Sequence, residues 1–295
     1  MKKIIFCLIT VVMLVMMMLP ATSPPPVAAG GASVDFMQYA NEKDEWIGSI
    51  LQASNSKYYE CMSVPQRTIL ADIPSTAGGA HTYAFSHQAT KKGTHAYDWL
   101  TAYDQGNDPP LAFDACGEKI GKDFAAICES LHTSGYSILV DVPDDPFVSK
   151  DGSTQDRIDA YETQFENRQI KIWGDQPFAA ASMTLGHNVP DSGDTGDSDI
   201  EYVLAWTSNS TQILIEMAGH LAVSGNSTAN PVAWGPGLGA SQISGGPYHF
   251  SLGKLDGSAL GSQDNQIKGA DVLALVGTIT AHKFNDLNGN GVQDS

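Results

Sequence analysis

Gln169-Ile170-Lys171-Ile172-Trp173 alternates polar and apolar side chains, which is the pattern of a β-strand with one buried face. Short runs rich in β-branched and aromatic residues recur on both sides of this stretch, separated by turns rich in Gly, Pro, Asp and Ser. These runs lie at 67–73, 81–87, 136–142, 178–185, 202–208, 211–223, 248–252 and 272–284.

Helical periodicity is confined to two segments, 42–52 and 156–167. Strands therefore do not alternate with helices, as they would in a parallel α/β sheet. The pattern predicts an all-β fold, an antiparallel β-sandwich of jelly-roll or Ig-like type, with long loops and at most one or two short helices.

The composition argues against one class of function, nucleic-acid binding. Among 295 residues there are 33 acidic and 16 basic side chains, and the formal net charge is −17. Nucleic-acid binding requires a basic surface, so neither DNA nor RNA is an expected partner. A chain of this size also buries enough surface to form a core without cysteine cross-links.

The N-terminus has the three regions of a secretory signal. Lys2 and Lys3 precede a sixteen-residue apolar run at 4–19, and Val27 and Ala29 fit the −3 and −1 positions of a cleavage site before Gly30. The run is shorter than the ~20 residues of a membrane span, although an uncleaved anchor is the alternative. We therefore expect a signal peptide at 1–29 and a secreted or cell-surface protein whose mature part has no membrane span.

Three cysteines follow the signal segment. An oxidising compartment favours a disulfide between Cys116 and Cys128, which stabilises the fold by about 3 kcal/mol if its geometry is unstrained. The alternative is three reduced cysteines. Cys61 is the odd one, either buried or available to another chain. The sequence has no C-x-x-C motif and so predicts neither a zinc knuckle nor a thioredoxin-like site.

Alternating oxygen-bearing side chains near the C-terminus follow the opening of a calcium loop. The expected ligands are the side chains of Asp286, Asn288, Asn290 and Asp294 and the backbone carbonyl of Val292. The bidentate acid of loop position 12 would fall beyond Ser295, so the predicted site is incomplete. The alternative is an Asn-Gly turn that binds nothing.

A second acidic loop is the other candidate for calcium. It contains Asp191, Asp194, Asp197 and Asp199, separated by small residues. Carboxylates this close repel one another unless solvent or a cation screens them. The alternative is a solvated surface loop.

Residues 277–294, with Lys283-Phe284 ahead of the Asp and Asn pattern, resemble the first strand and loop of the SD-repeat protein B-like (SdrD B-like) domain. This is a prealbumin- or Ig-like module of secreted bacterial surface proteins that binds calcium and occurs in tandem. Residues 58–67, 95–103, 218–222 and 245–250 are similar to the uncharacterised N-terminal β region ahead of such modules. The resemblance implies a sandwich domain at 30–275 and the start of a truncated module at 276–295.

The resemblance implies a structural or adhesive protein, stabilised by calcium and without enzymatic activity, whose partner is an extracellular glycan or matrix protein. A carbohydrate-binding sandwich is the first alternative, because four tryptophans offer flat apolar faces to sugar rings: Trp99, Trp173, Trp206 and Trp234.

A secreted hydrolase is the second alternative. Its candidate acid, base and metal-binding groups are His95, Asp98, His220 and His249. The sequence has neither an H-E-x-x-H nor a G-x-S-x-G motif to support it.

Overall fold

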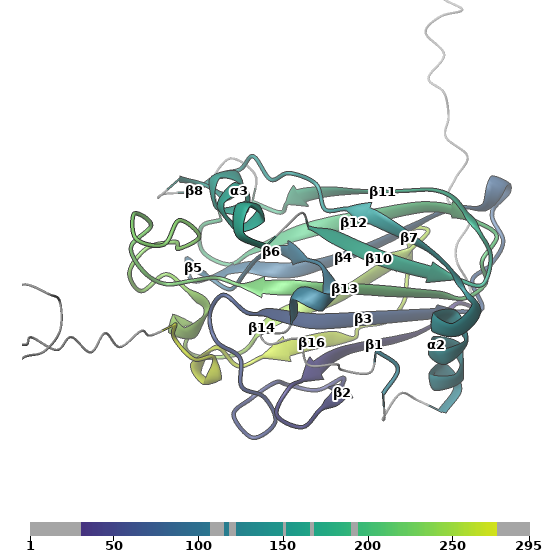
Figure 1. The fold of residues 1–295 in the computed structure, drawn as a ribbon, viewed down its shortest axis with the longest axis horizontal. Helices are drawn as coiled ribbons and strands as arrows, with labels where there is room; N and C mark the ends of the chain where they lie inside the picture. The colour runs from purple at the N-terminus through teal and green to yellow at the C-terminus, as the bar shows by residue number, and fades with distance from the viewer. Residues whose placement is uncertain are drawn as a thin grey trace, which may run out of the picture.

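A computed structural model describes residues 31–106, 115–117, 122–149, 152–165, 168–189 and 194–275. Two β-sheets of seven strands each face one another, and every ladder between the named strands of these sheets is antiparallel (Figure 1). The predicted all-β antiparallel sandwich is confirmed.

The first sheet, called sheet A below, contains the longest fully buried strands. Its order is β2 (Glu45–Ile47), β1 (Ser33–Ala40), β3 (Ser63–Ala71), β13 (Ile213–Leu221), β10 (Gln169–Gly174) and β7 (Tyr136–Asp141), and β6 (Tyr97–Thr101) also pairs with β13.

The second sheet, called sheet B below, has the order β11 (Phe178–His187), β12 (Ser198–Ser208), β4 (Ala80–Lys91), β14 (Tyr248–Leu255) and β15 (Ser258–Ala259). In addition, β16 (Asp264–Ile267) pairs with β14, and β5 (Thr94–His95) pairs with β4. A separate short ladder joins β8 (Val148–Ser149) to β9 (Gly152–Ser153).

Aromatic side chains fill the space between the sheets. The ring of Phe85 on β4 stacks at 5.3 Å on Tyr202 and at 6.0 Å on Phe250, which lie on the two neighbouring strands. Ile172, Ile213 and other apolar residues of sheet A close this core from the opposite side. Inward-facing residues of two sheets form the core of a sandwich in this way.

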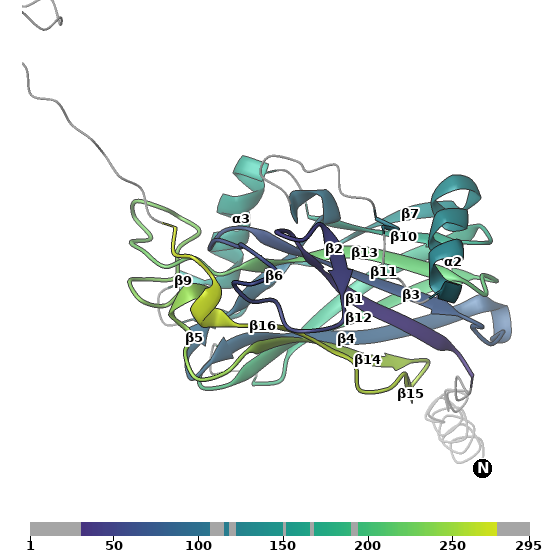
Figure 2. The same ribbon diagram turned by 90° about the horizontal axis from the view of Figure 1, so that it is seen from below.

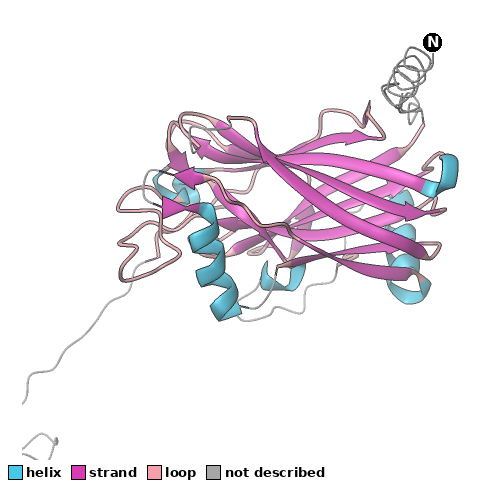
Figure 3. Cartoon of the chain, turned by 90° about the horizontal axis from the view of Figure 1, so that it is seen from above, coloured by secondary structure: helices cyan, strands magenta, loops and turns pink. Residues whose placement is uncertain are grey.

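Both helices lie on the side of sheet A (Figures 2 and 3). Helix α2 (Lys122–Ser134) packs Cys128 and Leu131 against Ile69 and Leu214, on the face of sheet A that points away from sheet B. The central strands β3 and β13 are therefore buried on both faces, whereas β12 alternates between buried and more exposed residues.

The helix predicted at 156–167 is confirmed as α3 (Thr154–Phe165). The helix predicted at 42–52 is wrong, because this segment contains the short strand β2, paired to β1. There the buried Trp46 packs against Tyr39 and under the guanidinium of Arg67, and these tertiary contacts override the helical periodicity.

Helix α2 was not predicted, and neither were strands β1, β6 and β16. Four 3₁₀ turns complete the described elements: η1 (Ala77–Gly79), η2 (Tyr103–Gly106), η3 (Ala240–Gln242) and η4 (Gly269–Asp271). The strand predicted at 272–284 is wrong for its described part, where 272–275 form only one isolated bridge, between Leu273 and Tyr59.

The predicted signal segment at 1–29 and the predicted module at 276–295 lie outside the described residues. Among the helices that are described, none combines the length and the apolar character needed to cross a bilayer.

Candidate functional sites

Asp98 on β6 and His220 on β13 form a buried pair where these two strands meet. Nδ1 of His220 lies 2.6 Å from Oδ1 of Asp98, and the indole N–H of Trp234 donates to Oδ2 at 3.0 Å. Trp99 stacks on the imidazole at a centroid distance of 4.5 Å. The orientation of the imidazole is thus fixed from two directions.

The free cysteine Cys61 lies beside this pair. It precedes β3 in a turn closed by a hydrogen bond from Met62 N–H to Tyr59 C=O, and its φ of +73° is in the left-handed region. Its N–H donates to the carbonyl of Leu221 at 2.9 Å, so the turn is held against the end of β13 that carries His220. Cys61 itself is partly exposed.

Nε2 of His220 is fully buried and has no hydrogen-bond partner within normal geometry. Burial lowers the pKa of His220, but the Asp98 carboxylate and the Cys61 thiol outweigh burial and raise it to about 10. The imidazole is therefore a cation at neutral pH. The resulting arrangement is an imidazolium–carboxylate pair with a thiol beside it.

Trp234 connects this cluster to the rest of the fold. His95 stacks on its ring at 3.6 Å, and the guanidinium of Arg157 lies 4.1 Å from the ring centroid. Burial, with a smaller contribution from Arg157, lowers the pKa of His95 to about 3, so His95 is neutral.

Of the four residues proposed for a hydrolase, the structure brings together Asp98 and His220. His95 contacts Trp234 instead, and His249 on β14 pairs with Asp264 on β16 at 2.5 Å. Cys61, which completes the cluster, was noted in the sequence only as an unpaired cysteine. The contact between β6 and β13 brings Asp98 to His220 across 122 residues of sequence, and no local motif signals it.

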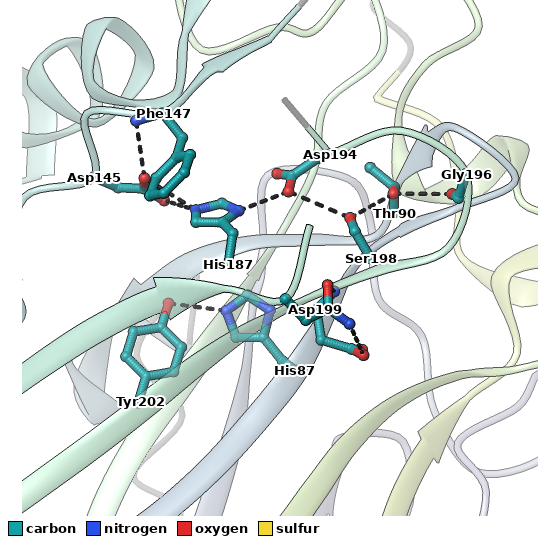
Figure 4. A network of polar contacts seen from close by, with 11 residues as sticks. His87, Thr90, Asp145, Phe147, His187, Asp194, Gly196, Ser198, Asp199 and Tyr202 are labelled. Carbon is teal, nitrogen blue, oxygen red and sulfur yellow. Dashed lines mark hydrogen bonds and ion pairs between the residues drawn. The ribbon is translucent and has the colours of Figure 1, made fainter. Parts of the chain in front are cut away.

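His187, at the end of β11, is held between two carboxylates (Figure 4). Nδ1 lies 2.6 Å from Oδ1 of Asp194, and Nε2 lies 2.9 Å from Oδ2 of Asp145. Despite the opposing effect of burial, these carboxylates raise the pKa of His187 to about 9. Because both ring nitrogens are occupied, His187 cross-links two loops and has no nitrogen left to act as a base.

The acidic loop that was the second candidate for calcium does not form a shared cation site among the residues the structure describes. Asp194 binds His187, Asp197 accepts the backbone N–H of Lys92 at 2.7 Å, and Asp199 accepts the side-chain amide of Asn188 at 2.9 Å. The three carboxylates point to three different protein partners, and Asp194 is buried rather than solvated. Asp191 lies outside the described residues.

The first candidate calcium ligands also lie outside the described residues. They are Asp286, Asn288, Asn290, Val292 and Asp294.

Cys116 and Cys128 are joined by a disulfide with a Cα–Cα distance of 5.5 Å. Their sulfur atoms and a ring nitrogen of His132 lie within 4.8 Å of one another. Metal ligation by cysteine requires thiolates, and both sulfurs are bonded to each other, so we assign no metal to this group.

A recess of about 550 Å³ lies on the face of sheet A that points away from sheet B; we call it the Trp173 recess. Its lining residues come from β7, β10, β13, α2, η2 with the residue before it, and the 115–117 segment: Ala102, Tyr103, Asp104, Ala115, His132, Leu139, Gln169, Lys171, Trp173 and Glu216. Trp99, Trp206 and Trp234 are buried in the core, so Trp173 is the partly exposed member of the four candidate tryptophans.

The indole of Trp173 is fixed in this recess. Its N–H donates to Glu216 at 2.6 Å, His132 stacks on the ring at 4.7 Å, and the ammonium of Lys171 lies 3.9 Å from the ring centroid. The other carboxylate oxygen of Glu216, Oε1, accepts a hydrogen bond from Nε2 of His132 at 3.0 Å.

A second recess, of about 680 Å³, lies along β4, β11 and β12 of sheet B. Small residues such as Ala180, Ala205 and Thr82 form much of its lining, and His81 and Asp256 pair at 2.8 Å beside it.

No family model matches this chain, and neither a curated protein nor a solved structure matches it. The assignment of function therefore depends on the geometry of the chain itself.

Proposed function

We propose that this chain is an extracellular adhesive module, the N-terminal part of a larger multidomain surface protein, and that it binds a saccharide in the Trp173 recess without catalytic turnover. The observation that carries the proposal is a partly exposed, rigidly held indole in a recess rimmed by polar side chains. Fold alone does not specify a function, so the argument depends on this site.

The extracellular location is supported by the signal-like N-terminus and by the disulfide between Cys116 and Cys128. Disulfides persist in oxidising compartments and are rare in the cytosol. This disulfide ties the segment 115–117 to α2, and the carbonyl of Ala115 accepts a hydrogen bond from Arg67 at 2.7 Å. The cross-link therefore holds one wall of the Trp173 recess.

The chemistry of the Trp173 recess suits a saccharide. An aromatic ring packs against the apolar face of a sugar, while polar groups at the rim bind its hydroxyl groups. Leu139, which is 56% exposed, extends the apolar surface. The side chains of Gln169 and Asp104 also line the recess, where they supply amide and carboxylate groups to bind hydroxyls.

The ammonium of Lys171 lies over one face of the Trp173 ring. A cation–π contact of a partly exposed lysine is worth about 0.5–1 kcal/mol, so a sugar ring displaces the ammonium at small cost. The displaced ammonium, on its flexible stem, then donates hydrogen bonds to the ligand.

The proposal is tested by glycan-array screening, followed by calorimetry with the best ligand. Trp173→Ala is expected to weaken binding at least tenfold, and Gln169→Ala severalfold. Val203→Ala is the matched control, because Val203 is exposed on sheet B, and it should leave affinity unchanged. Failure to retain any glycan, or an affinity that Trp173→Ala does not alter, would overturn the assignment.

A further inference from the structure

We propose that Cys61 is a reactive thiol, assisted by His220, that exchanges with small disulfides and so carries a low-molecular-weight thiol as a mixed disulfide. This site lies apart from the Trp173 recess and does not depend on the saccharide proposal.

The position of Cys61 is set by backbone contacts on both sides. Its N–H donates to the carbonyl of Leu221, and the N–H of Leu221 donates to the carbonyl of Met62 at 2.8 Å. The side chain packs at the edge of the buried cluster that contains Trp99 and Trp234, yet Cys61 keeps part of its surface exposed. A small reagent reaches such a thiol more easily than a folded protein does.

The imidazole of His220 is the second, independent feature. Asp98 holds its Nδ1, so Nε2 is the nitrogen left for another group, and this buried atom has no hydrogen-bond partner. The N–H of Cys61 donates to the carbonyl of Leu221, the residue after His220, so Cys61 lies at the end of the strand that carries this imidazole, and its thiol contributes to the raised pKa of His220. A protonated imidazole next to a sulfur favours the anionic, nucleophilic form in general.

Asp98 is a positioning residue in this arrangement. One of its oxygens binds His220, and the other accepts the indole N–H of Trp234 at 3.0 Å, so the carboxylate cannot rotate freely. Its negative charge keeps the imidazole protonated, with the pKa of His220 at about 10.

The proposed step is thiol–disulfide exchange. The sulfur anion of Cys61 attacks one sulfur of a small disulfide, a new S–S bond forms, and the S–S bond of the reagent breaks. One equivalent of the small thiol leaves as its anion and takes a proton from solvent. The small disulfide is the oxidant: Cys61 is oxidised to the mixed disulfide, and the small thiol that leaves is the reduced product.

The first experiment uses the full chain with Cys7→Ser, in which Cys61 is the one unpaired cysteine because Cys116 and Cys128 are bonded. Incubation with cystamine or oxidised glutathione at pH 7 should add half of the reagent to the intact mass. Cys61→Ala in the same background should add nothing. The native chain should react at least tenfold faster than the same chain in denaturant.

The second experiment measures the role of His220 and Asp98. Asp98→Asn should reduce the ratio of native to denatured rate about tenfold in a protein whose folding is verified by circular dichroism. The titratable groups that face His220 are Asp98, Cys61 and, from α3, Tyr161, whose pKa burial raises above its ordinary value. The native exchange rate should therefore change less between pH 7 and pH 9 than the denatured rate, because the imidazolium persists over this range.

A native rate equal to or below the denatured rate would overturn the proposal, since burial would then protect the thiol. A covalent dimer in place of the small mixed disulfide would also overturn it. If Asp98→Asn does not fold, the proposal is tested on the parent chain alone, by the ratio of native to denatured exchange rates and by the pH profile of the native rate. Cys61→Ala should retain saccharide binding, so failure of one proposal is distinguishable from failure of the other.

Discussion

His187 shows how one side chain stabilises two loops. Its imidazolium is buried between Asp145 and Asp194, and the ring of Phe147 lies 4.1 Å from it. Ser198 donates a further hydrogen bond to Asp194, which links the group to Thr90 on β4. Removal of the cation leaves two buried carboxylates without a counter-charge.

His187→Gln is therefore expected to lower the free energy of unfolding by about 3 kcal/mol, the range for breaking a buried ion pair. Chemical denaturation measures this change. The control is His249→Gln, because His249 and Asp264 are about one-third exposed and such pairs contribute about 0–1 kcal/mol. Equal effects of the two substitutions would contradict the assigned role of His187.

The histidines also predict how stability depends on pH. The pKa values of His187 and His220 are raised from 6.5 to about 9 and about 10, so their contribution is complete below pH 6.5 and is lost as pH rises through 9 and 10. Burial lowers the pKa values of His87 and His95 to about 3, so their contribution is complete above pH 6.5 and is lost as pH falls towards 3.

Thermal unfolding between pH 3 and pH 10 should therefore show a maximum near pH 6.5. The loss of stability between pH 6.5 and pH 9 should be smaller in His187→Gln than in the parent chain. A melting temperature that stays constant from pH 6.5 to pH 9 would refute the ionised state of His187.

At the scale of elements, α2 and its disulfide complete sheet A. The helix covers Ile69 and Leu214, which would otherwise be exposed on the central strands β3 and β13. The disulfide joins this helix to the segment at 115–117, which Arg67 binds from β3. The cross-link therefore restrains both the helix and the wall of the Trp173 recess.

Cys116→Ser with Cys128→Ser is expected to lower the free energy of unfolding by about 3 kcal/mol, because the unfolded chain gains loop entropy. Urea denaturation of the double variant, compared with Cys61→Ser, measures the difference. Cys61→Ser should change stability much less, and a larger effect for Cys61→Ser would contradict this ranking.

The loop at 224–241 closes over a buried carboxylate. Glu60 accepts hydrogen bonds from the backbone N–H and the hydroxyl of Ser224 and from the backbone N–H and the hydroxyl of Ser241. Gly239 lies between these groups, and a Cβ there would overlap the Ser224 backbone nitrogen and a Glu60 carboxylate oxygen.

Gly239→Ala should lower the free energy of unfolding by about 1–3 kcal/mol through overpacking. Gly186→Ala on β11 is the matched control, because open space surrounds the position of a Cβ at Gly186, and it should change stability by less than about 0.5 kcal/mol. Thermal and urea unfolding compare the two. Similar losses in both variants would argue against a tightly packed loop at 224–241.

At the scale of the whole molecule, the two proposed sites lie in different parts of the fold. The Trp173 recess is on the outer face of sheet A, and Cys61 lies in the turn that leads into β3. The recess is lined in part by β7 and β10, whereas Cys61 lies just before β3, so substitutions at one site are not expected to move the other.

We expect calcium to stabilise a chain that carries the complete C-terminal module, through the carboxylate and amide groups of Asp286, Asn288, Asn290 and Asp294 with the Val292 carbonyl. A ligand that binds only the folded state raises its stability by mass action. The melting temperature in millimolar calcium should exceed that in chelator, and Asp286→Ala should remove the difference. An unchanged melting temperature would refute the calcium proposal.

Several elements could be predicted from local sequence. The alternation at 169–173 and the β-branched runs at 81–87 and 202–208 correctly predicted strands, because alternation records which face of a strand is buried. Helix α2 had a signal that was missed, since Phe124, Ile127, Cys128 and Leu131 follow helical spacing. The helical periodicity at 42–52 was misleading, because the burial of Trp46 against Arg67 favours a strand there.

The sequence by itself determined the fold class and the excess of acidic charge, because side-chain periodicity and composition are local properties. Only the tertiary structure decided which histidines have partners. It brought Asp98 to His220, Cys61 to the same imidazole, and Asp145 to His187, across separations that local patterns do not report. Tertiary packing then set the charge of these four imidazoles: the carboxylates packed against His187 and His220 keep these rings protonated, whereas burial in the core keeps His87 and His95 neutral.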